Sequence, residues 1–124
     1  MKFPLLILCC LLSFYGHSQS IYTSSFTQTW PTIFNSRVEE VNKTISFEDN
    51  TITLATETPS GKEIELFFIQ KISENNGATE YFCLNSKDQP ITVILPFPEN
   101  LRFIDIYRPS LKTREEVQYR LHLN

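Results

Sequence analysis

The chain has 124 residues, with 11 basic and 14 acidic side chains and a formal net charge of −3, and only three of its residues are glycine. That length fits one domain, large enough to bury roughly two-thirds of the surface that its unfolded chain exposes. The basic residues are scattered, which argues against nucleic-acid binding because that depends on grouped Lys and Arg, and no glycine-rich phosphate loop is present.

The first eighteen residues have the pattern of a cleaved signal peptide. Lys2 gives a charged start, an apolar run covers residues 3–15, and the small residues Gly16 and Ser18 precede a cleavage point before Gln19. A bilayer span needs about 20 apolar residues, so this run is too short to be one. We predict cleavage after Ser18 and a secreted or periplasmic domain, with no membrane association once the signal is removed.

Cysteine usage bears on the compartment and the source. Cys9 and Cys10 belong to the signal, so Cys83 is the single cysteine of residues 19–124 and has no partner for an internal disulfide. Small secreted eukaryotic domains often rely on several bridges, so a bridge-free exported domain favours a bacterial source. The alternative, a lipid anchor on Cys9 or Cys10, lacks the small residue that such signals place before the modified cysteine, because Leu8 precedes Cys9.

The composition after the signal favours β-strands. Residues 19–124 contain only two alanines but 27 Ile, Val and Thr residues. Residues 21–30 predict a first strand. Phe34, Val38 and Val41 have helical spacing and predict a short helix before the first hairpin.

Two hairpins are expected next. Residues 44–48 and 51–56 alternate on either side of Asp49-Asn50 and form the first. The apolar side chains expected to face one another across it are Ile45, Phe47, Ile52 and Leu54. Residues 62–73 and 79–85 form the second hairpin, around an Asn-Asn-Gly turn that supplies the positive φ angles a tight turn needs.

Three further strands complete the prediction. Residues 91–95 alternate until Pro96, which cannot donate a ladder hydrogen bond. Residues 101–107 and 117–123 follow, and residues 113–117 could instead hold a helical turn. Seven or eight short strands joined in chain order form an antiparallel meander, which we expect to be closed or nearly closed into a small barrel as a single all-β domain.

Two residues are similar to a pair found in lipocalin-like barrels. Trp30 lies near the start of the mature chain and Arg120 lies in the last strand. The resemblance implies a barrel of that kind. It covers these two residues and the topology, and Gln28 stands where lipocalins carry a glycine.

The strand at residues 62–73 changes its pattern midway, because three apolar residues follow one another at 67–69. The residues predicted to face the core are Ile64, Leu66, Phe68 and Ile72. Phe67 and Ile69 would then form a second apolar surface. Either the N-terminal segment around Trp30 covers that surface, or it faces a ligand or a partner protein.

Few residues could carry catalysis. The mature chain has one histidine, His122, and one cysteine, Cys83, whereas a tetrahedral zinc site normally needs three or four such ligands, so we predict no metal and no cofactor. A nucleophilic pair of Cys83 with His122 would make a small hydrolase. A cysteine between Phe82 and Leu84 is more typical of a core position.

The short connection between the last two strands places them side by side and antiparallel. The expected register pairs Ile104 with Leu121, Ile106 with Tyr119, Asp105 with Arg120 and Phe103 with His122. The outward face then gathers a polar patch of Phe103, Asp105, Tyr107, Arg120 and His122. Arg and Tyr often anchor binding sites. The alternative is a solvated face on which Asp105 and Arg120 form an exposed pair, contributing about 0 to 1 kcal/mol.

Two functions from different classes remain. The first is an exported, non-enzymatic binding or interaction module for a small apolar ligand or for a protein partner, such as a secreted enzyme that it inhibits. Its candidate binding residues are Phe67, Ile69, Phe103, Asp105, Tyr107, Arg120 and His122. The second is the hydrolase built on Cys83 and His122, which rapid alkylation of Cys83 near neutral pH would favour.

Overall fold

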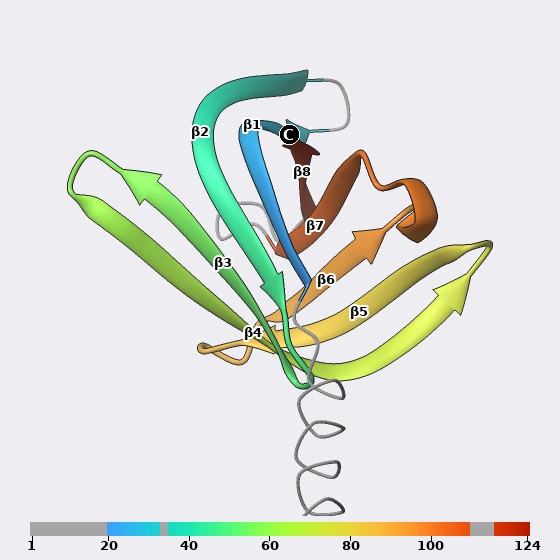
Figure 1. Cartoon of the computed structure of the whole chain (residues 1–124). Helices are drawn as coiled ribbons and strands as arrows, with labels where there is room; N and C mark the ends of the chain where they lie inside the picture. The colour runs from blue at the N-terminus through green and yellow to red at the C-terminus, as the bar shows by residue number, and fades with distance from the viewer. Residues whose placement is uncertain (1–19, 33–34, 110–115) are drawn as a thin grey trace, which may run out of the picture.

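A computed structural model describes residues 20–32, 35–109 and 116–124, so the predicted signal peptide and its cleavage point lie outside the described residues. The described chain forms eight antiparallel strands in one closed barrel, and their order around the barrel is their order along the chain (Figure 1). The predicted all-β meander is confirmed. In the part of the chain that the structure describes, no helix has the length and apolarity needed to cross a membrane.

The bounds of seven strands lie within two residues of the predicted ones, whereas β2 begins nine residues before the strand predicted at 44–48. The strands are β1 (Ser20–Thr32), β2 (Asn35–Phe47), β3 (Thr51–Thr58), β4 (Gly61–Asn75), β5 (Ala78–Asn85), β6 (Pro90–Leu95), β7 (Phe103–Pro109) and β8 (Glu116–Leu123), with the 3₁₀ turn η1 (Pro98–Asn100) between β6 and β7. The strand expected at residues 21–30 is part of β1. Most of the alternative helical turn at 113–117 lies outside the described residues, and Val117 belongs to β8.

The helix predicted before the first hairpin is wrong. Val38 and Val41 lie in β2, and Phe34 falls outside the described residues. The pairing of β1 with β2 shifts by one residue between Ser24 and Phe26, which inserts an extra residue into β2 beside Val41. The spacing of three residues between Val38 and Val41, which is also typical of a helix, therefore occurs here at a β-bulge.

The inner face of the barrel holds the hydrophobic core. The buried cluster contains Ile45, Phe47, Ile52, Leu54, Phe67, Cys83, Ile91, Val93, Leu95, Ile104, Ile106 and Leu121. Ile45 lies opposite Leu54 and Phe47 opposite Ile52, as predicted. Each fully buried side chain of this size contributes about 1.5 to 3 kcal/mol through the hydrophobic effect, and side chains, rather than a lumen, fill the middle of the barrel.

The inward face of β4 is the opposite of the predicted one. Phe67 is 0% exposed, whereas Ile64, Leu66 and Phe68 are 64%, 40% and 41% exposed. Ile69 lies on the inner side with Phe67 and packs against the core. An exposed second surface built on Phe67 and Ile69 is therefore wrong, and the second apolar surface is formed by their neighbours.

The fourth residue predicted to face the core, Ile72, follows a bulge at Gln70 that shifts the alternation by one position. It lies opposite Tyr81 but is 53% exposed, whereas Tyr81 packs against the core.

The β3–β4 hairpin projects from the barrel at the other end. β2 pairs with β3 only between Lys43–Thr56 and Phe47–Ile52, and β5 pairs with β4 only from Phe67 onward. The end of the β3–β4 hairpin thus extends beyond both neighbours, and it lies apart from the remaining strands in Figure 1.

Candidate functional site

The register predicted for the last two strands is confirmed in all four pairs, including Asp105 opposite Arg120. Nε of Arg120 donates to Oδ1 of Asp105 at 2.9 Å, and Nη2 donates to Oδ2 at 3.2 Å. This hydrogen bonding raises the pKa of Arg120. Burial, followed by the charge of Asp105, raises the pKa of the neighbouring Tyr107.

Aromatic rings enclose the guanidinium of Arg120. Its central carbon lies 3.9 Å from the centre of the Phe103 ring and 5.3 Å from that of Trp30. Trp30 reaches this position because β1 pairs with β8, with Gln28 opposite Arg120. The two residues on which the lipocalin resemblance rests are therefore in contact, and Trp30 covers the polar patch rather than the outward face of β4.

The polar patch is more enclosed than an exposed sheet face. Asp105 is 6% exposed, so the alternative of an exposed Asp105–Arg120 pair is wrong. His122, on the same face, lies with Nε2 3.0 Å from Oε1 of Gln28 in a hydrogen bond. Asp105 and Arg120 thus bind each other, and His122 binds Gln28 of β1, so the role of the patch as a ligand site stays a prediction.

Cys83 and His122 are not brought together. Cys83 is buried on the inner face between Ile69 and Ile91, and burial raises its pKa to about 11. His122 points outward from β8, a strand that does not neighbour β5. A thiol with so high a pKa stays protonated near neutral pH and is therefore a poor nucleophile. Among the described residues, no group of three or more His, Cys, Asp or Glu is placed to hold a metal ion.

A continuous apolar surface lies on the outward face of β3, β4 and β5. We define the outer strip as Ala55, Ile64, Leu66, Phe68, Phe82 and Leu84. The register places Ile64 beside Ala55, and Phe68 beside Leu84. Phe82 is 36% exposed. The outer strip therefore crosses three neighbouring strands.

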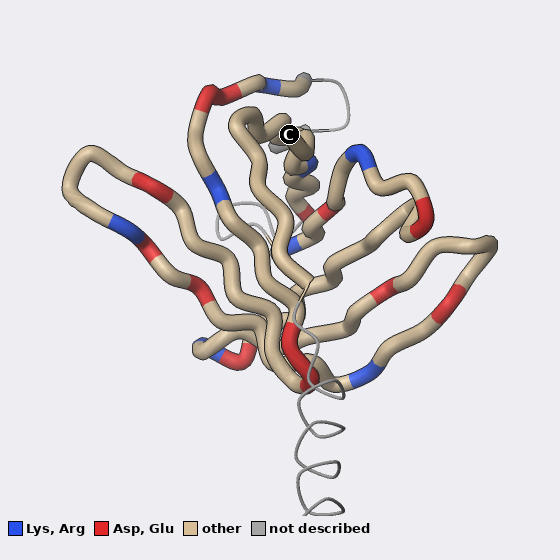
Figure 2. Tube along the Cα trace, in the orientation of Figure 1, with Lys and Arg blue, Asp and Glu red and all other residues tan. Residues whose placement is uncertain are grey.

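The charged side chains of β4 lie outside the outer strip. Glu63 and Glu65 lie on the inward face of β4, opposite Thr56 and Leu54. On the outward face of β4, Lys62 and Lys71 stand at the two ends of the strip, opposite Glu57 and Phe82. Figure 2 shows the backbone of β4 without a charged residue between Glu65 and Lys71.

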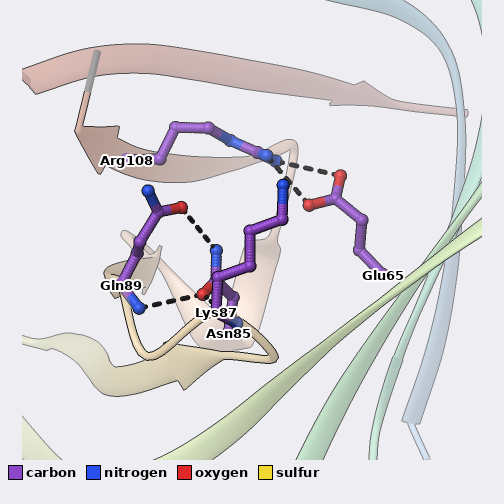
Figure 3. Close-up of polar contacts among 5 residues, drawn as sticks. All are labelled: Glu65, Asn85, Lys87, Gln89 and Arg108. Atoms are coloured by element: carbon purple, nitrogen blue, oxygen red, sulfur yellow. Dashed lines mark hydrogen bonds and ion pairs between the residues drawn. The ribbon is translucent and has the colours of Figure 1, made fainter. Parts of the chain in front are cut away.

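A second charged cluster lies inside the barrel at the projecting end. Nη1 of Arg108 donates to Oε2 of Glu65 at 2.9 Å, and Nη2 donates to Oε1 at 3.3 Å (Figure 3). The guanidinium carbon of Arg108 lies 4.8 Å from the ring centre of Tyr119. Burial, followed by the charge of Arg108, lowers the pKa of Lys43 beside it. The sequence patterns singled out neither Arg108 nor Lys43.

A pocket of about 330 Å³ opens beside this cluster, between β4, the loop from β5 to β6, and the end of β7. Its lining combines the apolar Ile64 and Leu66 with the charged Glu65, Lys87 and Arg108. The pocket could therefore accept a ligand with both an apolar and an ionic part.

No known family model matches the chain, and the searches of curated proteins and of solved structures gave no match.

Proposed function

We propose that the chain is an exported interaction module that binds a partner protein through the outer strip. The observation that carries this proposal is the exposure of Ile64, Leu66, Phe68 and Phe82 on one face of two paired strands. Single exposed apolar residues are ordinary on protein surfaces, but a contiguous apolar patch marks an interaction site. Export is supported by the signal-like pattern of residues 2–18.

A protein partner fits this surface better than a small apolar ligand does. Small-ligand sites are concave and enclose most of the ligand. Here the exposed apolar side chains stand on the outside of a sheet, while the inner face is packed with its own side chains. A broad apolar surface with lysines at its ends matches the common interface plan of an apolar centre and a polar rim.

The outer strip is also favoured over the polar patch of β7 and β8. Arg120 is held by Asp105 and two aromatic rings, so a ligand would have to displace existing contacts to use its charge. Among the described residues, the side chains of the outer strip make no ion pair or ring contact that a partner would have to displace. Covering them with a partner would remove apolar area from water at a gain of about 25 cal/mol per Å².

Photo-cross-linking in the compartment to which the protein is exported tests this proposal. A photoreactive phenylalanine analogue at position 82 should yield one discrete adduct with a partner protein. The same analogue at Phe97, which is 66% exposed but lies outside the outer strip, should yield none. The purified partner should bind Phe68→Ser at least tenfold more weakly than the wild type, and Phe97→Ser with unchanged affinity.

Three results would contradict the proposal. The first is equal cross-linking at positions 82 and 97, and the second is undiminished binding of the partner by Phe68→Ser. The third is an adduct of twice the mass of the chain, which would identify a second copy, not a different protein, as the occupant of the outer strip.

A further inference from the structure

The first six residues of β4 have a neighbouring strand on one side only. Residues 61–68 all pair with β3, but pairing with β5 begins at Phe67 opposite Asn85. Beyond Asn85 the chain turns away into the loop that leads to β6. Within the described residues, no strand lies along the second side of residues 62–66, and such an edge is a template for another strand.

The hydrogen-bond pattern shows which backbone groups face this open edge. N–H of Ile69 donates to the carbonyl of Asn50 on the β3 side at 2.8 Å. In an antiparallel ladder such bonds recur at every second residue, so Ile64 and Leu66 direct their N–H and C=O groups to the other side. N–H of Asn85 donates to Gln89 at 3.0 Å, toward β6, which agrees with this alternation.

The pocket of about 330 Å³ lies directly along this edge, because Ile64, Glu65 and Leu66 form one of its walls. The opposite wall is an ordered loop. Oδ1 of Asn85 accepts hydrogen bonds at 2.9 Å from the backbone N–H groups of both Lys87 and Gln89. Figure 3 shows the side chain of Lys87 extended from this loop toward the Arg108–Glu65 pair.

The charges around the pocket favour an acidic ligand. Lys87 and Arg108 are cationic, and Glu65 is the one acidic residue among the described residues of the lining. Within the described part of the chain, the ammonium of Lys87 has no ion pair. Nε of Arg108 is buried without an acceptor in the described structure. A carboxylate entering the pocket would therefore meet the ammonium of Lys87, in a described lining that has one more cationic than anionic side chain.

We propose that the open edge of β4 binds an extended peptide that adds a strand to the sheet and places an acidic side chain in the pocket. The main chain of the peptide pairs with Ile64 and Leu66, and its carboxylate lies beside Lys87 and Arg108. Because side chains alternate along a strand, the residues flanking the acidic one are apolar and continue the surface of Ile64 and Leu66. This site goes beyond the proposed function, since it does not require the outer strip to bind a protein.

An opposing explanation is that the charges only protect the edge. Inward-pointing charged residues on an edge strand discourage pairing with other chains, and Glu63 and Glu65 have that position. Glu65, however, is held by Arg108 and so is neutralised in place. Protection predicts that no peptide binds, whereas strand addition predicts binding that depends on acidic side chains.

Fluorescence anisotropy with a labelled hexapeptide of alternating valine and aspartate tests the site on the full chain after signal removal. This peptide should bind at least tenfold more tightly than one of alternating valine and lysine. Lys87→Ala should weaken binding of the aspartate peptide about tenfold. The matched variant Lys71→Ala, which removes a lysine from the same sheet away from the pocket, should leave the affinity unchanged.

Two measurements distinguish peptide binding by strand addition from peptide binding through charge alone. Ile64→Pro removes an N–H that makes no ladder bond to β3, so the fold should be kept while peptide binding is lost. Hydrogen exchange should show slower exchange of the Ile64 and Leu66 amides in the wild type with the aspartate peptide bound. Unchanged exchange at both residues, equal binding of the two peptides, or equal losses in Lys87→Ala and Lys71→Ala would overturn the proposal. None of these results depends on Phe68 or Phe82, so failure here leaves the proposed function standing.

Discussion

Single residues in this barrel show how charge is kept in a largely apolar fold. Arg108 and Arg120 each donate two hydrogen bonds to one carboxylate and lie over aromatic rings. The planar guanidinium is suited to both contacts at once, which a lysine cannot reproduce. The two arginines differ in surroundings, because Arg120 lies on the outward face beside Phe103 and Trp30, whereas Arg108 lies on the inward face and borders a pocket.

The buried thiol of Cys83 should make stability depend on pH in the alkaline range. Burial raises its pKa from the ordinary 9.0 to about 11. Between these values the folded chain binds more protons than the unfolded chain, so the free energy of unfolding falls as pH rises. The contribution of Cys83 is complete below pH 9 and is lost as pH passes about 11, with an upper limit of about 3 kcal/mol.

Urea unfolding of the wild type and Cys83→Ala at pH 8 and pH 10.5 measures this effect. The wild type should lose more stability between the two pH values than the variant does. Tyr81, whose pKa burial also raises, is present in both proteins, so the part of its contribution that comes from burial cancels in the comparison, while the smaller part that comes from the charge of Cys83 belongs to the effect of the thiol. An equal loss in both proteins would show that the thiol of Cys83 does not titrate abnormally.

At the scale of a strand, the facing of β4 can be tested with two adjacent phenylalanines. Phe67→Ser should lower the free energy of unfolding by about 3 to 5 kcal/mol, because it leaves a cavity and buries a hydroxyl in the core. Phe68→Ser should cost about 1 kcal/mol or less, since Phe68 is partly exposed. Urea denaturation measures both values. Similar losses for the two variants would contradict the inward placement of Phe67 alone.

The register set by the turn before β4 predicts which side chains of β4 point inward. Thr58 lies opposite Gly61 around a two-residue turn, and this register sets Leu54, predicted to face the core, opposite Glu65. Hydrophobic alternation indicated the reverse, because Ile64 is apolar and Glu65 is charged. Local alternation could not include Arg108, which comes 43 residues later and pairs with Glu65 inside the barrel.

The polar patch shows what could and what could not be predicted from the residue pattern of single strands. The register of β7 with β8 could be predicted because β8 alternates strictly, Asp105 separates two isoleucines in β7, and a short connection joins the strands. The burial of Asp105 could not, because Trp30 beside Arg120 comes from the other end of the chain. Neither the outer strip nor the pocket at Arg108 could be placed until the facing of β4 was known.

At the scale of the whole molecule, closure joins the first strand to the last. β1 pairs with β8 over residues 24–30, and N–H of Asn124 donates to the carbonyl of Thr23 at 3.0 Å. Pairing segments so far apart in sequence is entropically costly, and this cost is met when the core forms. The barrel is therefore expected to unfold as one unit, while the projecting β3–β4 hairpin can open by itself.

Native-state hydrogen exchange should separate these two kinds of opening. Amides of Gln28 and Arg120, which lie opposite one another in the β1–β8 seam, should exchange only through global unfolding. The amide of Glu63 lies opposite Thr56, at the last position where β2 pairs with β3 and beyond the end of β5, so local fraying should make it exchange at least about a hundredfold faster. A destabilising core variant such as Phe67→Ser should speed exchange in the seam but leave the rate at Glu63 nearly unchanged. If the seam exchanged as fast as Glu63, or if Phe67→Ser sped both sites equally, the barrel would not be the cooperative unit that its closure implies.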